Sequence, residues 1–303
     1  MKVILAETAG FCFGVQRAVD LVNKKIEEGA SPIHTYGPII HNEEVTRDFE
    51  KKGVYVLDEE KIKASAENAL KENSNTEKSG NEESGAGSDK GTIVLRSHGV
   101  ARAQKEYLEQ AGYEIADATC PFVTKIHRAV EKFGKEGHFI LIVGNDKHPE
   151  VEGIKGWCVG PYMVIEDKSD IDFDVLPKDK TITIVSQTTF RIEKFKELVD
   201  FIVKKGYNAN VMDTICDATR KRQEEAAKIA QQVDVMFVIG GQSSSNTRKL
   251  YEICSGICKH TYFLQTAEDF DPTTLHSANS VGITAGASTP NHIIKEVQKL
   301  CQM

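Results

Sequence analysis

Six short apolar runs, rich in β-branched residues, recur along the chain, two in each third, and each ends in a loop of small or polar residues. They occupy residues 33–37, 92–95, 139–143, 181–185, 235–239 and 280–283. Stretches with helical periodicity separate them, and this alternation is typical of parallel α/β units. Ligands bind outside the carboxyl ends of the strands in open α/β sheets, so we expect the six loops to line one shared cleft.

Three of the seven cysteines follow the same threefold repeat. Cys12, Cys120 and Cys216 each stand just before an expected helix, and the last two follow Asp-x-x at the same offset. A helix N-terminus lowers the pKa of a thiol and stabilises the negative charge of a metal–sulfide cluster. The C-x-x-C pairs of zinc and ferredoxin sites do not occur. The pattern therefore favours one cluster shared by three distant cysteines.

The other four cysteines are interpreted as packing residues. Cys254 and Cys258 are one helical turn apart but have no matching His or Cys pair nearby, and Cys158 and Cys301 stand alone. The N-terminal residues reach Glu7 too early for the apolar region of a signal peptide, and no stretch approaches the roughly 18–20 apolar residues of a membrane span. We therefore expect a cytoplasmic protein without a disulfide framework.

Residues 63–91 differ in composition from the rest of the chain. They are almost all Ala, Asn, Ser, Gly, Glu and Lys, and Leu70 is their only large aliphatic residue. Such a segment buries too little apolar surface to offset its ordering entropy, which predicts a disordered surface insert. With the insert set aside, we expect three α/β domains at 1–115, 116–210 and 211–303, with a C-terminal segment that packs back on the last.

Eight short motifs, in order, match one known family. They are Ala9 to Val15, Gly37 to Asn42, Arg96 to Val100, Asp117 to Pro121, His148 to Glu150, Ser186 to Thr189, Ser243 to Thr247 and Ala285 to Ser288. On these motifs the chain resembles the IspH/LytB family of 4-hydroxy-3-methylbut-2-enyl diphosphate reductases, which catalyse the last step of the non-mevalonate isoprenoid pathway. The resemblance covers nearly the whole chain except the insert, and it implies a trefoil-like arrangement of three related α/β domains around a central iron–sulfur cluster.

The resemblance also implies the site residues. It implies one [4Fe–4S] cluster on Cys12, Cys120 and Cys216, with Thr219 nearby, and it places Glu150 and Thr188 near the reacting hydroxyl. The residues that it implies for the diphosphate are His41, His98, His148, Ser244, Ser245, Asn246 and Ser288. The implied products are isopentenyl and dimethylallyl diphosphates.

The chemistry fits these residue types. Reductive removal of an allylic hydroxyl needs two electrons, two protons and a Lewis acid, and three protein ligands leave one iron of a [4Fe–4S] cluster open. No G-x-G-x-x-G nicotinamide motif occurs, so we expect reduced ferredoxin or flavodoxin as the donor. Glu150 is the only acid in its motif and is predicted to deliver the proton, with Thr188 orienting it. The alternative is that Glu150 pairs with a base or caps a helix.

Three weaker alternatives remain at this point. The loop from Gly240 to Asn246 precedes a helix and is interpreted as a phosphate-binding N-terminus, although it could be a simple turn. A zinc-dependent phosphoesterase could use the same His, Asp and Glu residues. A non-enzymatic anion-binding or translation-associated module would need a basic face or many aromatic residues, whereas this chain has a net charge of −7 and 7% aromatic residues.

Overall fold

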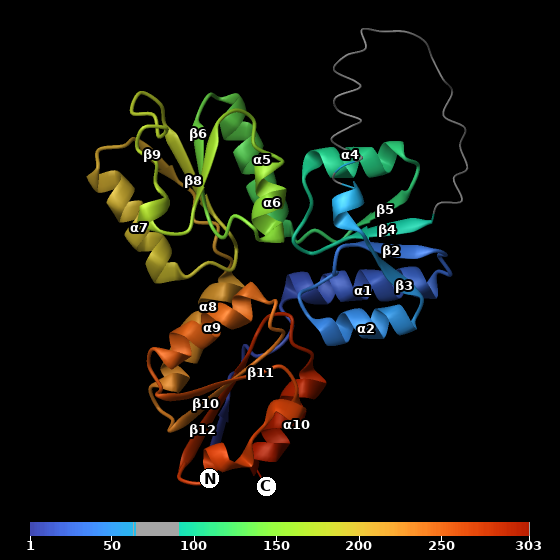
Figure 1. Cartoon of the computed structure of the whole chain (residues 1–303), viewed down its shortest axis with the longest axis vertical. Helices are drawn as coiled ribbons and strands as arrows, with labels where there is room; N and C mark the ends of the chain where they lie inside the picture. The colour runs from blue at the N-terminus through green and yellow to red at the C-terminus, as the bar shows by residue number, and fades with distance from the viewer. Residues whose placement is uncertain (63, 65–90, 303) are drawn as a thin grey trace.

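The structure, a computed structural model, describes residues 1–62, 64 and 91–302. Almost all of the expected insert lies outside the described residues, and its disorder stays a prediction. The described chain forms three α/β domains arranged around a common centre (Figure 1), each built on a four-stranded parallel sheet. The predicted fold class, three α/β domains in a trefoil-like arrangement, is confirmed.

The first sheet has the strand order β3-β2-β4-β5, and helices cover both of its faces (Figure 1). Side chains of α1 and α2 pack on one face with Val94 and Ala116, whereas Leu108 of α4 packs on the other with Ile93 and Leu95. The elements are β2 (Ile33–Tyr36), β3 (Val54–Leu57), β4 (Thr92–Leu95), β5 (Glu114–Asp117), α1 (Phe13–Glu27), α2 (Glu43–Lys51) and α4 (Arg102–Gln110).

The second sheet repeats this arrangement in the order β7-β6-β8-β9. Helices α5 and α6 cover one face, and α7 covers the other with a core that includes Phe195 and Leu198. The elements are α5 (Pro121–Lys135), β6 (Phe139–Val143), α6 (Pro149–Lys155), β7 (Tyr162–Ile165), η1 (Lys168–Asp170), β8 (Ile182–Ser186), α7 (Ile192–Lys204) and β9 (Ala209–Val211).

The third sheet has the order β1-β12-β10-β11 and so takes one strand from the start of the chain. Helices α8 and α9 pack on one face, and α10 packs on the other through Ile293 and Val297. The elements are β1 (Lys2–Leu5), α8 (Asp217–Ala230), β10 (Val235–Ile239), α9 (Ser245–Ser255), β11 (His260–Leu264), η2 (Ala267–Asp269), η3 (Pro272–Leu275), β12 (Ser280–Ala285) and α10 (Asn291–Gln302).

The placement of β1 differs from the expected domain ranges. Residues 1–115 were expected to form one domain, but β1 pairs with β12 in the third sheet, with Lys2 opposite Ser280. The other two expected boundaries fall inside β5 and β9, which end at Asp117 and Val211. The reason is that β1, β5 and β9 are equivalent edge strands, each of which leads from one sheet into the first helix of another domain.

The six runs that the sequence shows most clearly are the six central strands, β2, β4, β6, β8, β10 and β12. The strand residues of β4, β6, β8 and β10 are all buried, because helices cover both faces. Among the described residues, no helix combines the length and apolar character needed to cross a membrane.

Candidate active site

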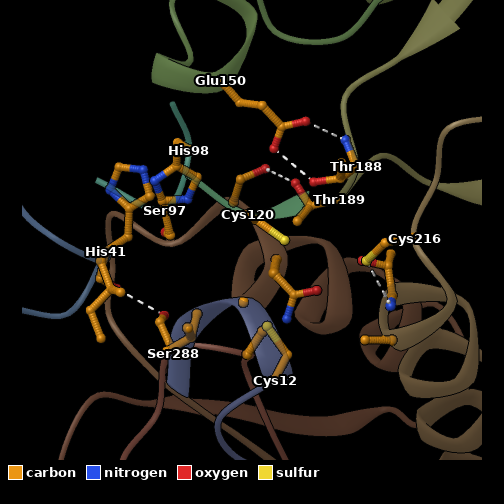
Figure 2. Close-up of a pocket in the computed structure, with 18 of the residues that line it drawn as sticks. Cys12, His41, Ser97, His98, Cys120, Glu150, Thr188, Thr189, Cys216 and Ser288 are labelled. Atoms are coloured by element: carbon orange, nitrogen blue, oxygen red, sulfur yellow. Dashed lines mark hydrogen bonds between the residues drawn. The ribbon is translucent and has the colours of Figure 1, made fainter. Parts of the chain in front are cut away.

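The loops after all six central strands meet at one pocket (Figure 2). Every site residue expected from the sequence lines it: Cys12, His41, His98, Cys120, His148, Glu150, Thr188, Cys216, Thr219, Ser244, Ser245, Asn246 and Ser288. The prediction of one shared cleft at the strand ends is confirmed. Residues from all three domains contribute, so the site exists only when the domains are assembled.

The three cysteines lie where the chain passes from one sheet to another domain. Cys12, Cys120 and Cys216 are the N-cap residues of α1, α5 and α8, which follow the edge strands β1, β5 and β9. Their sulfur atoms face a common space (Figure 2), and all three are free thiols. A Cβ added at Gly14 would lie 2.6 Å from Cys120 Sγ, so only glycine allows α1 to approach this cysteine so closely.

Burial controls the ionisation of two of these thiols. It raises the pKa of Cys120 to about 11, although backbone N–H groups of Phe122 and Val123 act in the opposite direction. Burial also raises the pKa of Cys216, against the hydrogen bonds from Thr219. The N–H groups at each helix N-terminus lower the thiol pKa, as expected, but burial outweighs them, so the net pKa of both residues is raised. A thiolate-binding metal would have to displace their protons.

Three histidines from three strand-end loops, His41, His98 and His148, line the same pocket as the cysteines, and Figure 2 labels the first two. The ring centroids are 4.5 Å apart for His41 and His98, 5.4 Å for His41 and His148, and 5.5 Å for His98 and His148. Burial, together with the positive charge of Arg96, lowers the pKa of His41 to about 4 and that of His148 to about 3. The imidazoles are consequently neutral near pH 7, and each has one N–H to donate.

Several nitrogen atoms in the histidine region lack a hydrogen-bond partner within the described chain. These atoms are His41 Nε2, His98 Nδ1 and Asn246 Nδ2, all buried. Asn246 lies in the first turn of α9, whose N-cap Ser244 accepts a hydrogen bond from the Thr247 amide at 3.3 Å. Free buried donors beside a helix N-terminus make a site for an anion with several oxygen atoms.

Ser288 connects this region to the first domain. Its Oγ donates to the His41 carbonyl at 3.0 Å and lies 3.4 Å from Ser244 Oγ (Figure 2). Ser245 Oγ accepts from Gln187 Nε2 at 3.2 Å, which ties the third domain to the second. These hydroxyl groups join the loops of three domains around the same space.

Glu150 lies on the opposite side of the pocket from Ser288 (Figure 2). Thr188 donates to its carboxylate from the backbone N at 2.5 Å and from Oγ1 at 2.7 Å. Burial raises the pKa of Glu150 to about 7, against these two hydrogen bonds. The carboxylate accepts from Thr188, and no base of the described chain pairs with it, so among these residues the expected alternative of an ion pair is wrong. A carboxyl group with this pKa exchanges protons readily near neutral pH.

Of the further residues that line the pocket, three are polar and were not expected as site residues: Ser97, Thr189 and Arg222. Arg222 did carry a detectable signal, because it occupies an inward position of α8 together with Thr219 and Ala226, where a cation is unusual. Ser97 and Thr189 lie inside two of the family motifs, but their residue type did not mark them individually, since hydroxyl residues are common in strand-end loops.

Comparisons with known proteins identify similar chains. A family model described as LytB protein matches residues 3–302. The curated 4-hydroxy-3-methylbut-2-enyl diphosphate reductase of Caldanaerobacter subterraneus is 39% identical over 298 residues, which is 98% of this chain and 95% of that protein. The protein of the same name from Aquifex aeolicus is 38% identical over 309 residues, covering 100% of this chain and 98% of the relative.

Two solved structures share the fold over the whole chain. One, of (E)-4-hydroxy-3-methyl-but-2-enyl diphosphate reductase, "the Terminal Enzyme of the Non-Mevalonate Pathway", is 40% identical with a TM-score of 0.66, covering 100% of this chain and 99% of that one. The other, of E-1-hydroxy-2-methyl-but-2-enyl-4-diphosphate reductase from Plasmodium falciparum, is 26% identical with a TM-score of 0.85, covering 100% and 88%. The structure superimposes better on the second, although its sequence is less similar.

Proposed function

Because the chain belongs to the LytB family, as its motifs predicted, we propose that it reduces (E)-4-hydroxy-3-methylbut-2-enyl diphosphate to isopentenyl and dimethylallyl diphosphates. The observation that supports this most is the meeting of three cysteines, three histidines and the Glu150–Thr188 pair in one pocket. These groups correspond to the three requirements of the reaction: electron transfer, diphosphate binding and proton delivery.

We propose that Cys12, Cys120 and Cys216 hold one [4Fe–4S] cluster. Three free thiols face the same space from three helix N-termini, and each N-terminus favours negative charge nearby. Three ligands suit a cluster with one open iron, which would supply single electrons and a Lewis acid for the departing oxygen. The donor set, with no carboxylate or imidazole among the three, fits iron–sulfur ligation.

The diphosphate would bind on the other side of the pocket. His41, His98 and Asn246 have buried nitrogens that lack partners within the described chain and can donate to a ligand, and Ser244, Ser245 and Ser288 add hydroxyls. His148 belongs to the same cluster, and its Nδ1 accepts a hydrogen bond from the Glu150 amide at 3.1 Å. This contact leaves the proton of His148 on Nε2, where it can be donated to a ligand.

Glu150 would deliver the proton that converts the leaving hydroxyl to water. It is buried and its pKa is about 7, so it holds a proton for part of the time near neutral pH. Thr188 fixes the carboxyl orientation through two hydrogen bonds. A proton donor in this position is worth about 10²- to 10⁴-fold in rate.

Electrons would come from reduced ferredoxin or flavodoxin. Such carriers and seven free thiols both suit a reducing compartment, and we propose that the protein works in the cytoplasm. Phe13 and Phe122, which follow Cys12 and Cys120 closely in sequence, are exposed on the surface and mark an approach to the centre.

One experiment tests the main proposal. The protein is reconstituted anaerobically with iron and sulfide, reduced chemically, and incubated with (E)-4-hydroxy-3-methylbut-2-enyl diphosphate. We expect isopentenyl and dimethylallyl diphosphates by mass spectrometry after chromatography. A cluster-loaded, reduced protein that leaves this substrate unchanged would contradict the proposal.

The histidine cluster also supports a second candidate, a zinc-dependent phosphoesterase. The possible ligand atoms of His41, His98 and His148 lie within 4.8 Å of one another. Three His ligands and a water form a known type of catalytic zinc site. This candidate leaves the three cysteines without a role. Metal analysis separates the two: the hydrolase predicts stoichiometric zinc that is lost in His98→Ala, together with release of phosphate from the substrate.

A further inference from the structure

Arg222 is a buried cation that the proposed mechanism does not use. It lies on α8, six residues after Cys216, is 3% exposed and lines the pocket. Its Nε donates to the Thr8 carbonyl at 3.0 Å, and its Nη2 donates to the Thr8 and Gly10 carbonyls, the latter at 2.7 Å. Its Nη1 is buried without a hydrogen-bond partner in the described part of the chain.

Glu225, one turn further along α8, binds N–H groups of the same loop whose carbonyls Arg222 binds. Its carboxylate accepts from the amides of Glu7 and Thr8 at 2.8 and 2.9 Å, and from Thr8 Oγ1 at 2.5 Å. The helix that begins after Cys216 therefore holds both the N–H groups and the carbonyls of the loop that ends at Cys12. The relative positions of these two cysteines depend on this contact.

Both cysteines also interact electrostatically with the guanidinium of Arg222. Burial lowers the pKa of Arg222, whereas Cys12, Cys216 and Glu225 act in the opposite direction. A guanidinium nevertheless stays protonated in proteins. A buried, charged N–H group without an acceptor is costly, so a site that keeps one is built for an acceptor that arrives later.

We propose that Arg222 is a positioning residue of the cluster site: two of its nitrogens fix the Cys12 loop on α8, and Nη1 offers a hydrogen bond and a positive charge to the sulfur atoms of a bound cluster. This inference rests on the proposed iron–sulfur function. Each electron that enters the cluster adds negative charge, which a nearby cation in a low-dielectric interior stabilises. Net charge and hydrogen bonds to sulfur set the reduction potentials of such clusters, so Arg222 makes this one easier to reduce.

The test compares wild type, Arg222→Gln, Arg222→Lys and the control Arg220→Gln, each reconstituted anaerobically. Arg220 lies on the same helix, but its side chain pairs with Asp213 near the surface, so its loss changes the net charge equally without touching the pocket. We measure the midpoint potential by redox titration followed by electron paramagnetic resonance, and the rate of iron loss to a chelator.

We expect a more negative midpoint potential for Arg222→Gln and wild-type values for Arg220→Gln. Arg222→Lys keeps the charge and loses the fork of donors, so its potential stays near that of the wild type. Its cluster loses iron about 10-fold faster, the order expected for the loss of one or two hydrogen bonds.

Either of two results would overturn this inference while the proposed function stands. One is an Arg222→Gln cluster with the wild-type midpoint potential. The other is an Arg222→Lys cluster that loses iron to the chelator as slowly as that of Arg220→Gln. If Arg222→Gln fails to fold, the chelation rate of Arg222→Lys decides. A wild-type protein that takes up no iron and sulfide would overturn the proposed function, and this inference with it.

Discussion

Thr188 donates both its backbone N–H and its hydroxyl to the carboxylate of Glu150, which lies 38 residues earlier in the sequence, at 2.5 and 2.7 Å. The bond joins the loop after β8 to the first turn of α6, at the carboxyl ends of two neighbouring strands. Two donors to one carboxylate fix its orientation, yet burial still raises its pKa to about 7.

This pair leads to a prediction about proton delivery. Glu150→Gln keeps the shape of the side chain and removes its titratable proton, so we expect turnover to fall at least about 100-fold while the cluster and substrate binding remain. In the wild type, turnover should decline as pH rises above about 7, because the acid form is lost. Steady-state kinetics across pH measure both effects.

The control is Glu152→Gln, the same change two residues away on α6, where the carboxylate lies 3.1 Å from Lys155 Nζ. It should keep near-normal turnover. If Glu150→Gln turned over at a near-normal rate with an intact cluster, the proton would have to come from another group, such as the diphosphate.

The raised pKa also predicts a cost in stability. Below about pH 4.5 Glu150 is neutral in the folded and unfolded states. Between this pH and about 7 only the unfolded state loses its proton, so the free energy of unfolding falls, by roughly 3 kcal/mol in total. The Gln side chain does not titrate, so the variant avoids this loss. We therefore expect the Tm of Glu150→Gln minus the Tm of wild type to be about 5 °C higher in mildly alkaline than in acidic buffer. A Tm difference that does not change with pH would contradict the raised pKa.

The cysteine assignment predicts two classes of variant. Changing Cys12, Cys120 or Cys216 to Ser should abolish turnover and leave less than about one cluster per chain after reconstitution. Cys158→Ser is the matched control, since its Sγ only donates to the Ile154 carbonyl at 3.4 Å and a hydroxyl can do the same. Iron and sulfide analysis with the absorption spectrum measures the outcome. An active Cys120→Ser protein with a normal cluster would disprove the assignment.

The buried amide of Asn246 leads to a prediction about diphosphate binding. Asn246→Asp replaces its free, buried Nδ2 donor with a negative charge at nearly constant shape. We expect the KM for the substrate to rise at least about 100-fold, because under the proposed function a charged acceptor would replace a donor to phosphate oxygens. Asn208→Asp is the control, as Asn208 is exposed and its Nδ2 donates to Thr181 Oγ1 at 2.9 Å, outside the pocket. An equal KM for both variants would place the diphosphate elsewhere.

The sequence revealed the central strands and did not reveal the edge strands. Strands such as β6 are buried on both faces and read as unbroken apolar runs, whereas the edge strand β7 keeps Tyr162 exposed and shows a mixed pattern. The strand β1 was missed for another reason. Its partner Ser280 lies at the other end of the chain, and strand pairing over such a separation leaves no local signal.

The residues of the candidate site were predictable where they stood in a loop after a central strand, as with His98 and Glu150. The resemblance to a family supplied their roles, which residue type alone left open. The inward position of Arg222 on α8 was detectable, but its partners were not: they are the carbonyl groups of Thr8 and Gly10, and backbone atoms carry no sequence signature. Only the assembled domains bring these atoms together.

The pairing of β1 with β12, from Lys2 opposite Ser280 to Leu5 opposite Ile283, has a consequence for biosynthesis. Of the strands described, β1 leaves the ribosome first and β12 last. At roughly 5–20 residues per second, β1 waits on the order of 15–60 s for its partner. The first and second sheets have all their strands before then. The third sheet, and with it the loop that carries Cys12, is completed only after β12 has been made, so the three cysteines reach their relative positions only after the last described strand has been synthesised.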